Sequence, residues 1–473
     1  MGRHLRLVLF RHTQIDSPFV DSDVIHMQVG GMSTIILDSM EAIREMLDVR
    51  SSSYSDRTRL PMAVELSGWD WAISLMPYGE TWRKHRKMMH ESFNVVVAKQ
   101  FRPQLIKSTN ALLERLVGES DRVLDELRLM AGSFILDVAY GIKVKSTDDP
   151  YMHIVETAMD ALSYTAIYGS FLVDYLPALK YLPGWIPGCG FRRKAAIWYQ
   201  ASHDLIEKPF AETLRNMASD SESPSFTAKL IREGAGKADP ERNEIIRNTA
   251  GIIYAGAAET TVSTLGWFVL AMLKHPEVQR KAQAEVDAVL GHGALPRFED
   301  RPMLPYVEAV VKEVLRWKPV TPLAVPHMSS LDYDDEFRGF RIPAGAEVVG
   351  NAWAVLQDET TYPEPTTFNP ERFLRDGKLD PTVQDPEVAA FGFGRRMCPG
   401  RHLAIDALWI NIASIIATLN IEKCVDKATG SVLEPSYEGR GVLVVSPVPF
   451  KCKFTVRSAQ SERAIQAANL FSE

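Results

Sequence analysis

Apolar positions recur along this chain with two different periods, and the change of period divides it into regions. Near the start, residues 24–30 and 33–39 form two short apolar runs on either side of a pair of glycines. This pattern predicts two β-strands joined by a turn. Residues 38–47 then predict a helix, in which Asp38 and Glu41 have the spacing of a capping box.

The helical period dominates the middle of the chain. The longest predicted helix spans 239–274, about 50 Å at 1.5 Å per residue. Its first two residues, Asp239 and Pro240, suit the N-cap and the first helical position. Two further helices are predicted over 276–291 and 304–317, each with a proline at its start. Residues 218–225 are polar and predict a loop.

Near the end of the chain the period returns to two. Residues 442–445 and 450–456 predict strands, and in the second strand Cys452 lies on the apolar face, where we expect it in the core. Residues 458–473 have the composition of a polar tail. The sequence therefore predicts a mainly α fold with a smaller β lobe.

Composition and charge exclude several classes of protein. The 473 residues are 46% hydrophobic and 24% charged, which is typical of a globular chain. A net charge of −7 does not favour a nucleic-acid partner. The four cysteines are scattered without a Cys-x-x-Cys pair, which argues against structural zinc and a disulfide framework. The longest apolar run in residues 1–22 spans only 5–10, so we expect no membrane anchor in that segment.

One short loop concentrates unusual chemistry. Residues 391–400 read FGFGRRMCPG and lead directly into a long apolar run. Two arginines and the free N–H groups of the following helix would act on Cys398, and both influences lower the pKa of a thiol. The glycines would let the backbone approach something flat and bulky. A cysteine with only a structural role in a turn is the alternative interpretation.

The loop resembles the heme-binding loop of the cytochrome P450 family. The match has five fixed positions, Phe391, Gly394, Arg396, Cys398 and Gly400. The resemblance implies the cytochrome P450 fold, a heme b cofactor (iron protoporphyrin IX), and Cys398 as the thiolate ligand of its iron. It extends over 23–457, which we interpret as a single heme domain, and it is strongest to fungal microsomal members.

Other motifs match the same family. Glu313 and Arg316 resemble its Glu-x-x-Arg pair, and 368–373 resembles the segment that adds Arg372 to it. The resemblance implies that these three residues form a buried ionic network with a structural role. It also implies that four side chains hold the heme or its propionates, in addition to Phe391 in the loop: Trp82, Arg86, His327 and Arg396.

The long helix contains AGAAETT at 255–261, an unusual group of small residues beside an acid and two threonines. The segment resembles the oxygen-binding groove of the family, with Ala257 at the usual glycine position and Gly256 beside it. Glu259 and Thr260 would then relay protons to dioxygen as the catalytic residues. A closely packed helix crossing is the alternative interpretation of the small residues.

These observations predict a heme-thiolate monooxygenase that inserts one oxygen atom of O2 into a small apolar substrate, such as a lipid, a terpenoid or an aromatic compound of secondary metabolism. No flavin or nicotinamide segment is left over, so we expect electrons from a separate NADPH–cytochrome P450 reductase, docked at Arg83, Lys84 and Lys87. A heme-thiolate isomerase or dehydratase without a reductase, and a non-catalytic helical interaction protein, are the alternatives.

The resemblance further implies a location at the cytoplasmic face of the endoplasmic reticulum membrane. Residues 182–194 read LPGWIPGCGFRRK, in which apolar residues precede three cations. Such a loop suits the interface of a bilayer and predicts a peripheral membrane contact. A buried loop is the alternative interpretation.

Overall fold

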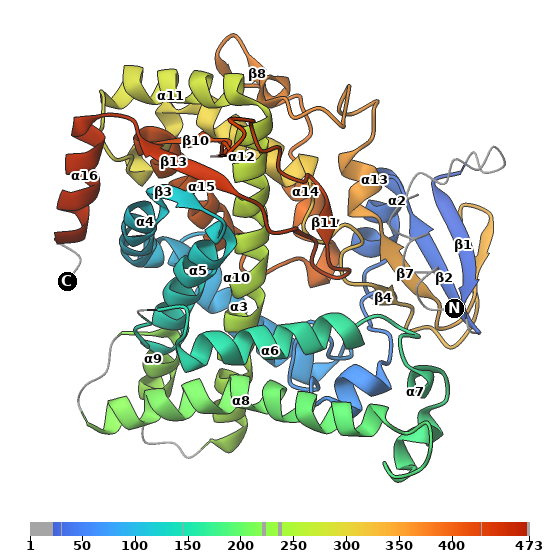
Figure 1. Cartoon of the computed structure of the whole chain (residues 1–473). Coiled ribbons are helices and arrows are strands. Elements are labelled where there is room, and N and C mark those ends of the chain that lie inside the picture. Colours follow the sequence, from blue (N-terminus) through green and yellow to red (C-terminus); the bar gives the residue numbers. More distant parts are fainter. Residues whose placement is uncertain are drawn as a thin grey trace.

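A long central helix, α10 (Pro240–Lys274), organises the computed structural model, which describes residues 22–29, 31–144, 146–219, 224–234, 239–426 and 428–470. Figure 1 shows α10 running through the helical part of the molecule, with other helices on several sides. Helices that pack directly against it include α3 (Glu80–Phe93), α5 (Val123–Tyr140), α8 (Phe191–Ala218) and α15 (Arg401–Thr418).

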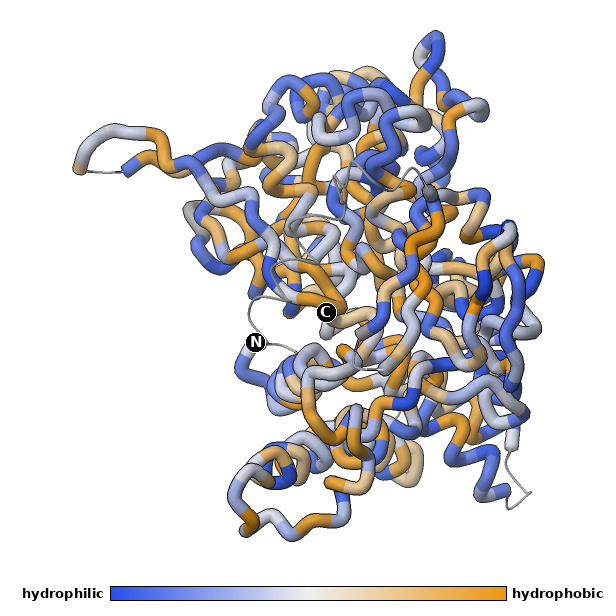
Figure 2. Tube along the Cα trace, turned by 90° about the vertical axis from the view of Figure 1, so that its right-hand side faces the viewer, coloured by the Kyte–Doolittle hydropathy of each residue, from blue (hydrophilic) through white to orange (hydrophobic). Residues whose placement is uncertain are grey.

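The remaining helices complete this helical region. They are α4 (Arg102–Leu116), α6 (Pro150–Thr165), α9 (Phe226–Glu233), α11 (Pro276–Leu290), α12 (Pro305–Trp317), α13 (Ala352–Leu356), α14 (Glu387–Ala390) and α16 (Ala459–Leu470). A large apolar core lies between them, and Figure 2 shows hydrophobic stretches interspersed with hydrophilic ones along the trace.

Among the described residues, α10 is the helix long and apolar enough to cross a membrane. However, 72% of its most apolar 18-residue window is buried inside the protein, as expected of a core helix.

The β lobe lies at one side of the molecule (Figure 1). Its sheet has the strand order β1 (Val24–Val29), β2 (Met32–Leu37), β7 (Glu347–Gly350), β4 (His327–Met328). β1 and β2 form an antiparallel hairpin, β2 pairs in parallel with β7, and a second apolar core packs beneath the sheet. A smaller sheet joins β10 (Leu419–Glu422), β13 (Cys452–Val456) and β3 (Gly118–Ser120). The predicted mainly α fold with a smaller β lobe is confirmed.

Most of the predicted elements are present. The hairpin, α10, α11 and α12 match their predicted ranges closely, and Asp239 caps α10 by accepting from the Arg242 N–H at 3.0 Å. Cys452 is fully buried in β13, as expected. The predicted polar loop at 218–225 is framed by the end of α8 at Ala218 and by Ser225, the N-cap of α9, and residues 220–223 lie outside the described residues.

The predictions for the first helix and for residues 442–445 need correction. The first helix is capped by Ser39, whose hydroxyl accepts from the Ala42 N–H at 3.1 Å, because Asp38 is occupied by the Asn351 amide at 2.8 Å. That helix, α2 (Met40–Ile43), continues as the π-helical turn η1 (Arg44–Val49). Residues 442–445 form no strand, because the Val445 N–H donates instead to the Val320 carbonyl at 2.7 Å. β12 is limited to Ser446–Pro447.

The segment with a tail-like composition contains helix α16, which packs against α4. Its apolar anchor is Ile465, which is 4% exposed, and Ser461 beside it is also buried. One buried apolar side chain in a polar segment gives almost no periodic signal, so the helix was not apparent in the sequence. We expected no membrane anchor in residues 1–22. The structure describes only Ser22 of this segment, so the expectation lies outside the described residues.

Candidate active site

The loop that contains Cys398 lies between the 3-10 turn η7 (Gly394–Arg396) and the first turn of α15. The Cys398 N–H donates to the Phe391 carbonyl at 2.8 Å, which closes the loop on itself. Burial raises the pKa of the Cys398 thiol, while the N–H groups of Gly400 and Arg401 and the charges of Arg86 and Arg401 lower it. The predicted influence of the helix N-terminus is therefore present, but the cations that act on the thiol are Arg86 and Arg401 rather than the two arginines of the loop, Arg395 and Arg396, and burial outweighs them.

Gly394 fixes the loop against η1. Its φ is +56°, in the left-handed region that favours glycine. A Cβ atom at this position would lie 2.0 Å from the carbonyl oxygen of Leu47, a backbone atom that cannot move aside easily. The glycine of the motif is thus required both by the turn and by the close approach of η1.

Three buried or half-buried cations, Arg57, Arg86 and Arg396, gather beside the cysteine loop. Arg396 lies across the ring of Trp82, with its guanidinium carbon 4.6 Å from the ring centroid. Its three nitrogens donate to the backbone carbonyls of 55, 73 and 76 at 2.8–3.1 Å. Burial lowers its pKa to about 10, and the nearby charge of Arg86 adds to the effect. Two predicted motifs that are far apart in sequence therefore meet at one point.

Arg57 is a member of this cluster that sequence reasoning missed. Its side chain is buried and donates to the carbonyls of Ser74, Val325 and Pro326 at 2.7–2.8 Å. Burial and the charge of Arg396 lower its pKa. No motif or spacing in 55–60 distinguishes it from an ordinary surface arginine, because its burial depends on segments hundreds of residues away.

His327 lies beside these arginines at the start of β4. Burial, together with Arg57 and Arg396, lowers its pKa to about 3, so the imidazole is neutral. Its Nδ1 lies 2.7 Å from the Tyr54 carbonyl, and this contact assigns the proton to Nδ1. His327 could therefore donate from Nε2 to an anion only after it takes up a second proton, which the charge of the anion itself would favour.

None of the arginines in this cluster forms an ion pair with a carboxylate in the described part of the chain. Arg86 makes no hydrogen bond there either, and burial lowers its pKa. A buried positive charge without a partner is costly. The site thus offers guanidinium groups without a carboxylate partner to an anionic ligand, directly beside the half-buried Cys398.

Trp82 is buried at the start of α3, 5.2 Å from the ring of Tyr78. The outward side of α3 carries the predicted reductase-docking residues. Lys84 forms ion pairs with Glu80 and Glu241, and Lys87 lies 3.9 Å from Glu91. Arg83 is left without a carboxylate among the described residues, so the positive charge of this surface is weaker than the sequence suggested.

The predicted ionic network is present beneath the site. Glu313 and Arg316 are fully buried and form a bidentate ion pair at 2.7 and 2.8 Å. Arg372 adds a third contact to Glu313 at 3.3 Å, and the Asn369 N–H donates to the same carboxylate at 2.8 Å. This network ties α12 to the segment that precedes the cysteine loop.

The small-residue segment lies in the middle of α10. The Thr260 hydroxyl donates to the Gly256 carbonyl at 2.8 Å, which is the back-bond that loosens a helical turn. A Cβ atom on Gly256 would meet nothing within 4 Å, so open space borders the helix there. The alternative of a closely packed helix crossing does not fit Gly256, although it describes Gly251, where a Cβ would clash with Ile206.

Glu259 is turned toward α5. Its carboxylate lies 3.4 Å from Arg128, which is itself held by Asp125 at 2.8 Å. Burial raises the pKa of Glu259, Arg128 lowers it, and two acids on α6, Glu156 and Asp160, raise it further. Arg128 was also missed in the sequence, because a cation on α5 becomes a partner of Glu259 only when the two helices pack together.

The residues fit a flat, anionic, metal-containing group such as heme. Gly256 leaves open space on one side, Cys398 supplies one soft ligand, and the unpaired arginines suit carboxylates on the edge of the group. In the described part of the chain there is no cluster of three or more His, Cys, Asp or Glu residues that could hold a metal ion alone. Cys398 would therefore hold the iron of a bound heme as the single protein ligand that these residues offer, and the heme would supply the redox chemistry.

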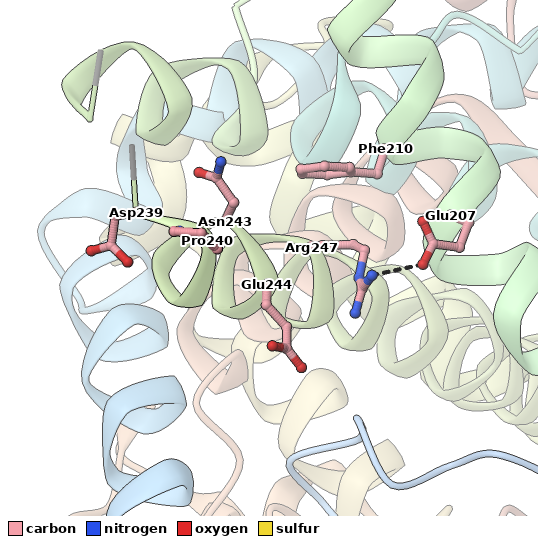
Figure 3. Close-up of a pocket in the computed structure, with 7 residues that line it drawn as sticks. All are labelled: Glu207, Phe210, Asp239, Pro240, Asn243, Glu244 and Arg247. Carbon is pink, nitrogen blue, oxygen red and sulfur yellow. Dashed lines mark hydrogen bonds and ion pairs between the residues drawn. The ribbon is translucent and has the colours of Figure 1, made fainter. Parts of the chain in front are cut away.

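A separate surface pocket of about 640 Å³ lies between α8 and the first turns of α10 (Figure 3). Figure 3 shows Phe210 and Glu207 of α8 facing Arg247 of α10, and Arg247 binds Glu207 at 2.7 Å. The pocket shares no residue with the cysteine site. Its carboxylates and single aromatic ring do not by themselves define a ligand.

The fold, the cysteine loop with its arginines and the open space beside α10 are together those expected of a heme protein. A sequence profile of the Cytochrome P450 family matches residues 21–454, and the chain belongs to this family. It is 43% identical to cytochrome P450 monooxygenase 98 of Postia placenta over 94% of this chain and 85% of that protein. It is 40% identical to tryptamine 4-monooxygenase of Psilocybe cyanescens, over 94% of this chain and 87% of that protein.

The fold comparison agrees. A solved structure of a zebra fish cytochrome P450 with abiraterone superimposes with a TM-score of 0.73 at 24% sequence identity, covering 96% of this chain and all of that one. The protein is accordingly a cytochrome P450 monooxygenase, an oxidoreductase that incorporates oxygen from O2, and the family implies a heme cofactor.

Proposed function

We propose that this enzyme hydroxylates a small apolar substrate of fungal secondary metabolism, with heme b bound at Cys398 in a single heme domain over 23–457. The observation that carries the proposal is the gathering of Arg57, Arg86 and Arg396, none with a carboxylate partner among the described residues, beside Cys398. Open space beside α10 at Gly256 supports it. When bound, the heme supplies the activation of O2. The roles of the protein residues follow from their positions.

Arg86, Arg396 and His327, with Arg57 behind them, would hold the propionates, and Trp82 and Phe391 would support the loop and the cofactor edge. Thr260 would hold a proton donor at the groove, because its hydroxyl is already oriented by the Gly256 carbonyl. Glu259 would supply protons from the α5 side, where Arg128 positions its carboxylate. This pair is the proposed acid–alcohol relay.

The substrate would be a lipid, a terpenoid or an aromatic compound. We expect the pocket walls to come from largely apolar segments, which supports this class: 62–76, 157–172, 252–260, 320–325 and 437–442. One relative is named for tryptamine, an indole amine, so aromatic amines belong among the compounds to be tested. A screen that follows the spin-state shift of the heme would rank these classes.

Electrons would come from a separate NADPH–cytochrome P450 reductase. The enzyme would act at the cytoplasmic face of the endoplasmic reticulum, with a peripheral membrane contact through the loop after α7 (Leu172–Tyr175). Trp185 in that loop is 82% exposed, and Arg193 and Lys194 at its end are exposed as well. A pocket of about 760 Å³ opens among these residues. Exposed tryptophan beside cations suits a lipid interface.

The first experiment is the carbon-monoxide difference spectrum of the reduced protein. The wild type should give the long-wavelength Soret band of a thiolate-ligated heme, and Cys398→Ser should lose both this band and product formation. Cys189→Ser is the matched control, because Cys189 is a buried cysteine outside the site and should leave the band unchanged. An unchanged band in Cys398→Ser would refute the ligand assignment.

A second measurement addresses the alternatives. With reductase and substrate present, the enzyme should consume NADPH and O2 together with product formation. Product formation without either reactant would favour the isomerase or dehydratase, and a spectrum without bound heme would favour a non-catalytic protein.

A further inference from the structure

The segment that begins with α7 forms a separate flap at the edge of the molecule. We call residues 171–194 the flap; it comprises α7, the 3-10 turn η4 (Pro177–Tyr181), the loop after it and the start of α8. Its apolar residues form a small cluster of their own with Met62, apart from the two large cores. Figure 1 shows α7 at the edge of the molecule, and the flap contacts the π-helical turn η2 (Pro61–Leu66) through this cluster and through the ion pair of Lys180 with Glu65.

One buried carboxylate fastens the flap to the rest of the protein. Asp174 of α7 is 4% exposed, and its Oδ1 accepts from the Met62 N–H at 3.0 Å. Met62 belongs to η2. The other carboxylate oxygen, Oδ2, is buried and has no hydrogen bond of good geometry, although the N–H groups of Phe171 and Gly169 lie near the carboxyl group. An ionised carboxylate at this position is costly because burial removes its hydration, and a neutral carboxyl costs less.

Asp174 forms no ion pair with any residue that the structure describes. Burial raises its pKa from 3.8 to about 6, and the N–H groups of Met62, Phe171 and Gly169 oppose the rise without overcoming it. The ionisable groups on the elements around it are Tyr168, Tyr175, Glu65 with its partners Arg59 and Lys180, and Arg192, Arg193 and Lys194. Glu347, which acts on Tyr168, is the other buried acid nearby.

η2 connects the flap with the candidate active site. It lies in the segment 57–76, whose far end supplies the Ile73 and Met76 carbonyls that bind Arg396. The near end is held at Met62 by Asp174. A change in the contact at Met62 therefore acts on a wall of the site through a short continuous stretch of backbone.

We propose that Asp174 is a proton-operated latch, which holds the flap docked on η2 when it is protonated and loosens the flap when it ionises. This inference does not depend on the substrate or on the reaction. Docking takes up a proton, because the carboxyl is buried in the docked state and solvated in the open one.

The direction and the size of the pH effect on docking follow from the difference between the pKa of Asp174 in the docked and the open state. The docked pKa of about 6 lies above the value of 3.8 that applies in solvent, so docking is favoured as pH falls. The ratio of open to docked molecules should rise about tenfold from pH 5 to pH 7, and should change little above pH 7.

Hydrogen–deuterium exchange on the heme-loaded full chain tests the latch. After correction for intrinsic exchange, amides in 60–67 and 169–182 should exchange about tenfold faster at pH 7 than at pH 5, with a midpoint near pH 6. Amides in α12 should show no such change. Asp174→Asn should abolish the pH dependence, because the amide is neutral throughout and its oxygen can still accept from Met62.

Glu347→Gln and Glu65→Gln are the matched controls, and both should keep the wild-type profile. The proposal is overturned if Asp174→Asn exchanges with the same pH dependence as the wild type, or if Glu347→Gln removes it. If Asp174→Asn does not fold, the wild-type profile decides: flap and α12 amides that respond equally to pH would refute the latch.

Discussion

The buried network around Glu313 allows a quantitative prediction, because a second acid nearby serves as its control. Glu313 is completely buried and accepts four hydrogen bonds, from Arg316 twice, from Arg372 and from the Asn369 backbone. Glu371, the residue before Arg372, forms an ion pair with Lys281. Both side chains are about half exposed, Glu371 at 51% and Lys281 at 56%. The two glutamates differ mainly in their contact with water.

Glu313→Gln keeps the size of the side chain but removes the negative charge, and leaves two buried guanidinium groups without compensation. Removal of one partner of a buried ion pair costs about 3–5 kcal/mol. Glu371→Gln should cost less than about 1 kcal/mol, because solvent screens an exposed pair. For a chain of this length the entropy of unfolding is about 1 kcal/mol per kelvin. Glu313→Gln should therefore lower the melting temperature by about 3–5 °C, and Glu371→Gln by less than about 1 °C.

The assay is thermal unfolding of the heme-loaded proteins at one fixed concentration of protein and heme. The double variant Glu313→Gln/Arg372→Gln should recover part of the loss, because it removes one of the two stranded cations. Equal shifts for Glu313→Gln and Glu371→Gln would refute the reasoning, since burial would then not decide the cost.

Two further predictions concern the relay and the membrane. Thr260→Ala should lower the product formed per NADPH consumed and raise the amount of peroxide. Thr264→Ala removes a similar back-bond one turn later and should leave both quantities unchanged. An unchanged ratio of product to NADPH in Thr260→Ala would favour a packing role for Thr260. Trp185→Ser/Ile186→Ser should reduce flotation with vesicles that contain anionic lipids, whereas Tyr333→Ser, also at an exposed residue, should not; equal flotation of all three would exclude this loop as the contact.

The sequence predicted those parts of the structure that depend on local signals. The proline and aspartate at the start of α10, the alternation in β13 and the five positions of the cysteine loop each carry their information within a few residues. The predictions failed where distant segments compete. Asp38 could not cap its helix because Asn351 binds it, and residues 442–445 form no strand because Val320 takes a backbone hydrogen bond.

The same distinction applies to the candidate site. Cys398, Arg396, Trp82 and Glu313 belong to recognisable motifs, and the structure brings the first three together. Arg57 and Arg128 belong to none, because they reach the site only through packing with segments far away in the sequence. The net rise in the pKa of Cys398 also follows from burial. The charges of neighbouring residues in the sequence do not reveal this burial.

The unpaired arginines beside Cys398 have a consequence for how the protein accumulates in a cell. Without an anionic ligand the folded chain must bury cations that the unfolded chain leaves in water, so the ligand contributes to folding as well as to the reaction. The yield of folded enzyme should therefore follow the supply of heme during synthesis. A host that makes the polypeptide faster than the cofactor would collect it as aggregate, and feeding a heme precursor would raise the soluble fraction without any change in the rate of translation.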